Sequence, residues 1–188
     1  LGATMAAKMT SEIFAVANGL QSDEERVNYL RQNQTKAVRE LLRHNFNKDI
    51  KFLLPEGRPD LSSTPDDMDF KPQNSYLPNI GPIDDGATLN YEVRRLYLFI
   101  EGGHPTLTNV KRETLWIELV NSLSPSEADD LWHMKEKELQ KKYDKITHHV
   151  AYNSFPEYLQ QPEPEPTRDN QGRFTSTKKS KAKKKAKK

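Results

Sequence analysis

The sequence predicts a mainly α protein: a small, irregular helical bundle with a long Pro-rich internal loop and a disordered, basic C-terminal tail. Apolar residues recur at spacings of three and four over much of residues 10–159, as they do along one face of a helix. The 12 prolines fall mainly in two stretches, 55–82 and 156–166, instead of being scattered through turns. Residues 178–188 contain eight lysines, so this segment cannot bury enough apolar surface to fold alone.

Three short helices are expected in the first 50 residues. The first begins at Thr10 or Ser11, either of which can cap its free amide groups. Ser22 and Glu25 have the spacing of a capping box and begin the second helix, and the third follows from about Lys36. Helices this short are stable only when they pack on other elements. The residues expected to face inward are Ile13, Phe14, Ala17, Leu20, Val27, Leu30, Val38, Leu41 and Leu42.

Two segments without clear helical periodicity follow. Residues 46–54 alternate imperfectly and end at Pro55-Glu56-Gly57, which predicts an extended or single-turn segment that packs its aromatic side chains on the helices. Residues 58–86 are rich in Pro, Asp, Ser and Asn and exceed the usual length of a connection. Loops of this length are commonly functional or disordered.

The second half predicts four more helices. One begins at Thr88, and Gly102-Gly103 can supply its left-handed C-terminal cap. Another spans about 108–123, the segment Ser124-Pro125-Ser126-Glu127 begins the next, and a short one covers 147–154. The residues expected to face inward are Leu89, Val93, Leu96, Tyr97, Ile100, Leu115, Trp116, Leu119, Val120, Leu123, Leu131, Trp132, Leu139, Val150 and Phe155.

One folded domain with flexible ends is the expected organisation. The Pro- and Glu-rich spacer favours an extended polyproline conformation that holds the tail away from the body. Met5 or Met9 could be the natural start, and no run of about 18 apolar residues is available to span a membrane. The expected units are a flexible extension (1–9), the helical domain (10–159), the spacer (160–174) and the Lys-rich tail (175–188).

The net charge of +2 is the sum of two opposed parts. Residues 162–188 hold ten basic and three acidic residues, so their charge is 10 − 3 = +7. The remainder holds 29 − 10 = 19 basic and 27 − 3 = 24 acidic residues, which gives −5. An acidic body is therefore joined to a basic tail that is suited to contact polyanions.

Four stretches, taken in order, resemble a known family: LRQNQTKAVRELL (30–42), FNKDIKFLLPEG (46–57), RRLYLFIEGG (94–103) and VKRETLWIELVNSLSPSEADDL (110–131). The family is one of unknown function encoded by tailed bacteriophages, notably large marine ones, and the resemblance spans roughly residues 10–159. It implies a phage protein in the cytoplasm of a bacterial host, or in the virion, and implies no activity. The long internal loop and the Lys-rich tail depart from the family pattern.

No residue set predicts an enzyme. The absence of Cys excludes disulfides, thiolate nucleophiles and Cys-based zinc sites. The one cluster that could bind a metal is His148-His149 with His133 and Asp129 or Asp130. Adjacent histidines on a helix point about 100° apart, and no H-x-x-x-H pair is present, so a solvated helix face is the expectation. We expect no catalytic residue, metal or cofactor, and an enzyme of unrecognised type stays a third alternative.

Two basic pairs, Arg94-Arg95 and Lys111-Arg112, lie near helix boundaries. They form either a secondary basic patch that contacts phosphate or ordinary surface ion pairs. The net acidic body favours the ion pairs, since isolated surface charges are usually solvated or paired. The candidate acidic partners are Glu92, Glu101, Glu113 and Glu118.

The tail is the main candidate for nucleic-acid contact. Lysine ammonium groups are point charges without base-reading geometry, so contact with DNA or RNA is expected to be nonspecific. The alternative is a solubility tail without a ligand. The predicted nucleic-acid-binding residues are Lys178, Lys179, Lys181, Lys183, Lys184, Lys185, Lys187 and Lys188.

The leading hypothesis for function is a phage accessory protein. Its helical body would bind a phage or host protein, while the tail holds nucleic acid. The alternative is a structural or assembly component of the virion, whose tail lysines meet packaged DNA or the capsid surface. Many copies per purified virion would favour this alternative.

Overall fold

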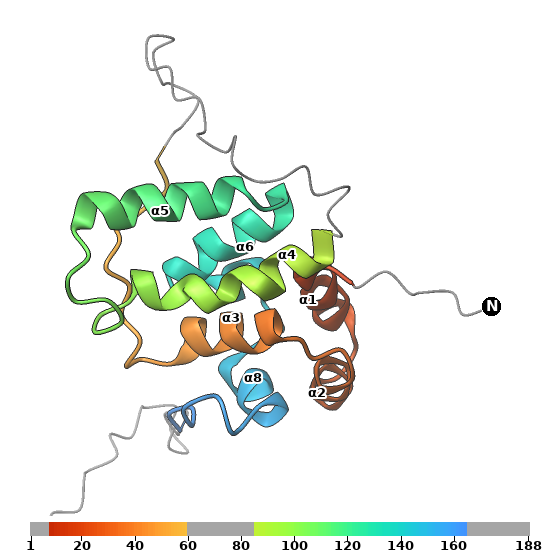
Figure 1. Cartoon of the computed structure of the whole chain (residues 1–188). Helices are drawn as coiled ribbons and strands as arrows, with labels where there is room; N and C mark the ends of the chain where they lie inside the picture. Colours follow the sequence, from red (N-terminus) through yellow and green to blue (C-terminus); the bar gives the residue numbers. More distant parts are fainter. Residues whose placement is uncertain (1–7, 60–84, 165–188) are drawn as a thin grey trace, which may run out of the picture.

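A computed structural model describes residues 8–59 and 85–164 of the chain (Figure 1). Within these residues the chain forms α-helices and one 3-10 helix and no strand, which confirms the mainly α prediction. The tail, most of the loop 58–86 and most of the N-terminal extension lie outside the described residues. The elements are α1 (Thr10–Gly19), α2 (Asp23–Gln32), α3 (Lys36–Phe46), α4 (Asp85–Glu92), η2 (Val93–Phe99), α5 (Asn109–Asn121), α6 (Pro125–Lys135), α7 (Leu139–Lys142) and α8 (His148–Ser154).

Helix α3 lies at the centre of the bundle. It packs against α1, α4, η2 and α6, while α2 packs against α1 and α8 (Figure 1). Its side chains Ala37, Val38, Leu41 and Leu42 are completely buried or nearly so. Among the described helices, none is long and apolar enough to cross a membrane.

Trp116 on α5 joins several parts of the core. Its ring centroid lies 5.1 Å from that of Phe99, 5.7 Å from that of Trp132 and 6.4 Å from that of Phe52. All three contacts are edge-on, an arrangement that aromatic rings favour. The largest fully buried side chains are Trp116, Phe14, Phe99, Ile13, Leu30, Leu41, Leu42, Leu89, Leu96, Leu119, Leu131 and Met134.

The predicted inward residues are buried with a few exceptions. Leu20, Val27, Ile100 and Leu115 are half-buried. Tyr97 is 49% exposed, so its assignment to the core was wrong.

The error at Tyr97 follows from a change of helix type. Helix α4 begins at Asp85, three residues before the predicted start at Thr88, and the chain becomes 3-10 at Val93. A 3-10 helix has three residues per turn, so residues three apart lie on the same side. The buried side is therefore formed by Val93, Leu96 and Phe99, and Tyr97 faces outward.

Helix α2 begins with the predicted cap at Ser22, whereas Ser124 precedes α6 as predicted but forms no side-chain cap hydrogen bond. The Ser22 hydroxyl accepts a hydrogen bond from the Glu25 amide (3.2 Å). The Glu25 carboxylate accepts from the Gln21 amide (3.0 Å), one residue earlier than a capping box requires. Thr35 and Thr108 cap α3 and α5 in the same way as Ser22 caps α2.

The start of α1 is capped from a distant element instead. Thr10 and Ser11 are the first helical residues, so neither is the N-cap, which is Met9. The Thr10 amide donates to the carboxylate of Glu127 on α6 (3.1 Å), and the Ser11 and Ser126 hydroxyls are 3.0 Å apart. Glu127 therefore stabilises α1 as well as beginning its own helix.

The segment after α3 is extended, as predicted. Phe52 forms an isolated antiparallel bridge with Ile100. The Leu53 amide donates to the Phe99 carbonyl and the Glu101 amide to the Lys51 carbonyl, both at 2.8 Å.

The two glycines after η2 form a turn and not a helix cap. Gly102 has a positive φ of 80°, but the helix already ends at Phe99 and Ile100 is extended. The Gly103 amide donates to the Ile100 carbonyl (3.2 Å) and closes the turn. A Cβ atom on Gly103 would lie 1.8 Å from the Tyr97 carbonyl oxygen, so only glycine fits there.

Gly103→Ala is expected to lower the free energy of unfolding by about 2 kcal/mol or more, because the methyl group forces the backbone apart. Urea denaturation measures this change. Gly19→Ala is the matched control, since a Cβ there meets nothing within 4 Å, and helix propensity predicts a gain of up to about 1 kcal/mol. Equal effects of the two substitutions would contradict the close approach at Gly103.

Candidate functional site

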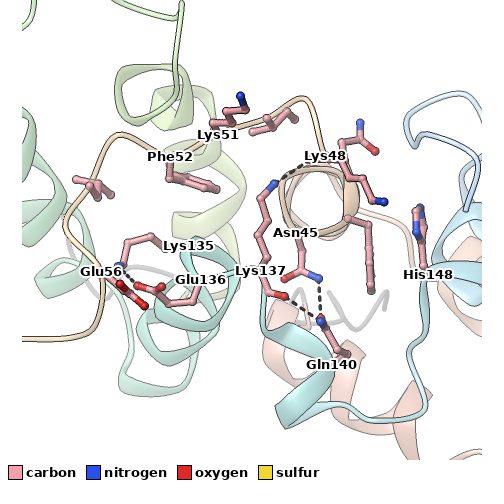
Figure 2. A pocket seen from close by; sticks show the side chains of 14 residues that line it. Asn45, Lys48, Lys51, Phe52, Glu56, Lys135, Glu136, Lys137, Gln140 and His148 are labelled. Carbon is pink, nitrogen blue, oxygen red and sulfur yellow. Dashed lines mark hydrogen bonds and ion pairs between the residues drawn. The ribbon is translucent and has the colours of Figure 1, made fainter. Parts of the chain in front are cut away.

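An open groove of about 620 Å³ lies between the C-terminal end of α3, the extended segment after it and the turn from α6 to α7 (Figure 2). Four lysines line it, Lys48, Lys51, Lys135 and Lys137, and we call it the lysine groove. In Figure 2, Lys135 lies near Glu56 and Glu136 at one end, Lys48 and His148 lie at the other, and Lys137 lies between them. The remaining lining residues are Asn45, Phe46, Asn47, Ile50, Phe52, Leu54 and Gln140.

The backbone of Lys137 is unusual. Its φ is 60°, the left-handed region that glycine normally occupies. The Lys137 amide donates to the Met134 carbonyl (2.9 Å) and the Glu138 amide to the His133 carbonyl (2.8 Å). These two bonds form a Schellman motif that ends α6 with a lysine in place of the usual glycine. The conformation costs about 1–2 kcal/mol.

The side chain of Lys137 closes the end of α3. Its ammonium group donates to the carbonyls of His44 and Asn47, the latter at 2.9 Å. A cation is favourable at a helix C-terminus because the last carbonyls have no partner within the helix. Burial lowers the pKa of Lys137 to about 8. The described residues contribute no carboxylate to an ion pair with it.

Lys135 organises the LLPEG turn. Its side chain is buried, and its ammonium group donates to the carbonyls of Pro55 (2.7 Å) and Gly57 (3.0 Å) and to the Glu136 carboxylate. Glu136 in turn accepts from the Gly57 amide (2.9 Å). The charges of Lys135 and Glu136 therefore compensate each other, and both have a structural role.

The C-terminal segment is bound beside the other end of the groove. The Lys48 amide donates to the Gln160 side chain (2.9 Å), and the Gln160 amide donates to the Asn47 side chain (2.8 Å). The Lys48 ammonium and the Glu163 carboxylate form an ion pair of 2.5 Å. The first residues of the predicted spacer thus contact the body.

His148 supports this anchor. Its ring is stacked on Phe46, with centroids 5.1 Å apart and an interplanar angle of 12°. Its Nε2 atom lies 2.8 Å from the Gln160 carbonyl oxygen. No local pattern predicts this role, because Phe46 and Gln160 lie 12 residues or more from His148 along the chain.

Comparison with known proteins places the chain in a family. A model for a family of unknown function (DUF6433) matches residues 13–141. The chain belongs to this family. No curated protein and no solved structure matches the chain.

The match to the family covers all four groove lysines and ends before the anchor at Gln160 and Glu163. All of the groove lining except His148 therefore lies within the part of the chain that the family model matches. The eight lysines of the tail lie beyond both the family match and the described residues.

The residues of the two predicted basic pairs differ in how deeply they are buried. Arg94 and Arg95 are exposed: the Arg94 guanidinium lies 3.9 Å from the centroid of the Tyr91 ring, and Arg95 pairs with Glu92 at 3.3 Å. Lys111 is exposed, whereas Arg112 is only 4% exposed.

Arg112 has an interior role that its charge did not reveal. Its guanidinium donates to the carbonyls of Leu98 (3.0 Å) and Leu107 (3.1 Å) and to the Asn109 side chain (2.8 Å). It holds the connection between η2 and α5. Of the four predicted patch residues, Arg94, Arg95 and Lys111 remain at the surface.

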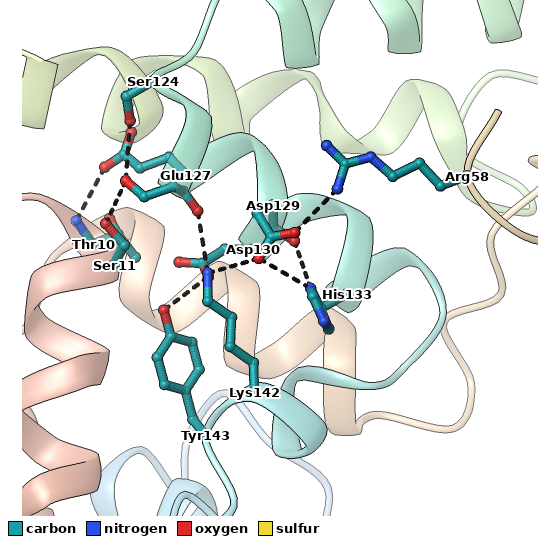
Figure 3. Close-up of polar contacts among 11 residues, drawn as sticks. Thr10, Ser11, Arg58, Ser124, Glu127, Asp129, Asp130, His133, Lys142 and Tyr143 are labelled. Atoms are coloured by element: carbon teal, nitrogen blue, oxygen red, sulfur yellow. Dashed lines mark hydrogen bonds and ion pairs between the residues drawn. The ribbon is translucent and has the colours of Figure 1, made fainter. Parts of the chain in front are cut away.

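A second polar cluster joins α6 to α7 (Figure 3). The Asp130 carboxylate is fully buried and accepts from the Lys142 ammonium (2.6 Å) and the Tyr143 hydroxyl (2.8 Å). Burial raises the pKa of Asp130 against the opposing effect of Lys142, and it also raises the pKa of Tyr143. Lys142 reaches Asp129 as well (3.0 Å).

The candidate histidine cluster that was weighed against a solvated helix face is not assembled around one point. His133 lies 3.5 Å from Asp129 in the polar cluster, while His148 lies in the lysine groove. In residues 8–59 and 85–164, no group of three or more His, Asp or Glu side chains is placed to hold a metal ion. The polar cluster lies outside the groove lining and ties two helices together.

Substitution of Lys137 tests the strain at the end of α6. Lys137→Gly is expected to leave a protein about 1 kcal/mol more stable than Lys137→Ala, because only glycine adopts the left-handed backbone without strain. Denaturant titrations of both variants measure the difference. At Lys141 in helix α7 the order should reverse, since alanine is the better helix former by about 1 kcal/mol. The same order at both positions would contradict the strain.

Lys137 should also make stability depend on pH. Its pKa is about 8 in the folded protein and 10.5 ordinarily. Between these values the unfolded chain keeps a proton that the folded chain has released, so its contribution to stability rises with pH. The difference in unfolding free energy between the unaltered chain and Lys137→Met should therefore grow in favour of the unaltered chain from pH 8 to 10. A constant difference would contradict the lowered pKa.

Proposed function

We propose that this protein is an accessory protein of a tailed phage, in which the lysine tail (residues 175–188) holds nucleic acid nonspecifically and the helical body binds another protein. The observation that supports nucleic-acid binding is the block of eight lysines within residues 178–188. The resemblance of residues 10–159 to a phage-encoded family supports the phage origin. The family itself has no known function.

The charge distribution favours the tail over the body as the main contact. The body outside residues 162–188 has a net charge of 19 − 24 = −5, so as a whole it repels a polyanion. Each lysine near a phosphate releases condensed counterions, and about five contacts would give a slope of −4 to −5 in log affinity against log salt. Such contacts do not distinguish sequences, because they involve phosphate groups and not base edges.

The helical body is proposed to bind another protein. Most of the family match lies in the helical body, so the common task of the family depends on the body and not on the tail. A folded helical body without a nucleotide-binding motif fits a protein-interaction role. A pull-down from infected cells, with and without nuclease, tests this part: a partner retained after nuclease treatment binds the body.

Replacement of the eight tail lysines by glutamine is expected to lower affinity for random-sequence duplex DNA at about 50 mM salt by at least 100-fold. The substitution keeps the length of the chain and removes only charge. Fluorescence anisotropy across a salt series measures both affinity and slope, and deletion of residues 175–188 should reproduce the loss. Unchanged affinity in both variants would overturn the proposed role of the tail.

A further inference from the structure

We propose that the lysine groove is a second phosphate-binding site, on the body, and that it contacts the same nucleic acid that the tail holds. This inference rests on the proposed function, which supplies nucleic acid as the class of ligand. The groove would be a folded contact surface in addition to the tail. Bound nucleic acid would then lie along one defined face of an otherwise acidic body.

The groove is locally positive. Its lining contributes four lysines and two glutamates, and Glu163 pairs with Lys48 on its rim, so the local sum is 4 − 3 = +1, beside a body whose net charge is −5. Glu136 is already compensated by Lys135, and the described residues offer no ion-pair partner for Lys51 or Lys137. A concave surface with excess charge of one sign concentrates ions of the opposite sign. Phosphate is the anionic group that the proposed ligand offers.

The Lys137 ammonium group, which lies 5.7 Å from the centroid of the Phe52 ring, has one N–H donor that meets no acceptor among the described residues. An ammonium group has three N–H donors, and two of them meet the carbonyls of His44 and Asn47. The third can donate to a phosphate oxygen without breaking the closure of α3. A strained backbone at a residue that lines a cavity is the kind of feature that often accompanies a functional site.

The described part of the C-terminal segment, which ends at residue 164, lies against this same face. Gln160 and Glu163 fix the C-terminal segment at Asn47 and Lys48, on the rim of the groove. A nucleic acid held by the tail is therefore tethered near the groove, and its contact with the groove becomes an intramolecular step with a high effective concentration. A few weak lysine contacts suffice under this condition.

Glu163 competes with the ligand for Lys48. The two side chains are largely exposed, at 79% and 68%, so their ion pair is weak and a polyanion can displace it. Removing the Glu163 charge should release Lys48 and strengthen binding of nucleic acid. The proposed site can therefore be tested by one set of substitutions that weakens binding and another that strengthens it.

The weakening test compares two charge-matched double variants of the full chain. Lys48→Glu with Lys51→Glu reverses two groove charges, and Lys36→Glu with Lys145→Glu reverses two exposed charges outside the groove lining. Each pair changes the net charge by 2 × (−2) = −4. Affinity for a random duplex DNA and for a single-stranded RNA is measured across a salt series.

The groove variant is expected to bind at least about tenfold more weakly than the control variant and to reduce the salt slope by about 2 relative to the unaltered chain, as two lost phosphate contacts do. Equal affinity and slope in the two double variants would overturn the inference. Circular dichroism and thermal unfolding show whether both variants remain folded. The DNA and RNA arms show which nucleic acid the groove prefers.

The strengthening test compares Glu163→Gln with Glu157→Gln, since Glu157 is exposed and the two substitutions change the net charge equally. Glu163→Gln should bind two- to threefold more tightly than Glu157→Gln. No difference would contradict the competition for Lys48. If replacing the tail lysines has no effect but the groove variants still differ, the proposed tail function fails while the groove stands. If the tail matters and the groove variants match their controls, the groove fails alone.

Discussion

Burial of α3 is the constraint on which the rest of the structure depends. An 11-residue helix is marginal alone in water, so α3 must be covered on several sides and its terminal polar groups must find partners. At its start the Ala37 amide donates to the Asn90 side chain (2.9 Å), from α4. At its end Lys137 meets the carbonyls of His44 and Asn47, and the Asn45 side chain accepts from the Leu139 amide (3.1 Å). The elements that supply hydrogen-bond partners to α3 are thereby held in place around it.

The same closure creates the lysine groove. Because Lys137 must reach the end of α3, the turn between α6 and α7 lies opposite the extended segment after α3, and the space between them stays open. Lys137 does this from a left-handed backbone position that glycine would normally occupy. Lys137 thus both binds the last carbonyls of α3 and contributes positive charge to the groove. The residue that makes stability depend on pH therefore also lies in the site that we propose for phosphate.

The buried charges elsewhere have mainly architectural roles. Glu127 caps α1 from α6, Arg112 on α5 binds carbonyls of η2 and of the connection that follows it, and Asp130 joins α6 to α7. Each is deeply buried, and each charged group has polar partners that offset the loss of hydration. Removing one partner would leave the other buried without compensation, so these groups are poor candidates for surface contacts despite their charge.

The sequence by itself determined the local features: the cap at Ser22, helix starts near Lys36, Thr108 and Thr147, the apolar stripes that form the core, and the extended segment before Pro55. These depend on neighbours three or four residues away, which a sequence pattern contains directly. Only the tertiary structure decided the 3-10 geometry that turns Tyr97 outward, the cap that Glu127 provides to α1, and the burial of Arg112. It also decided the groove, since Lys48, Lys137 and Gln160 are brought together by contacts that span 90 residues or more along the chain. No local pattern encodes such contacts, because they depend on how the apolar faces of all the helices pack at once.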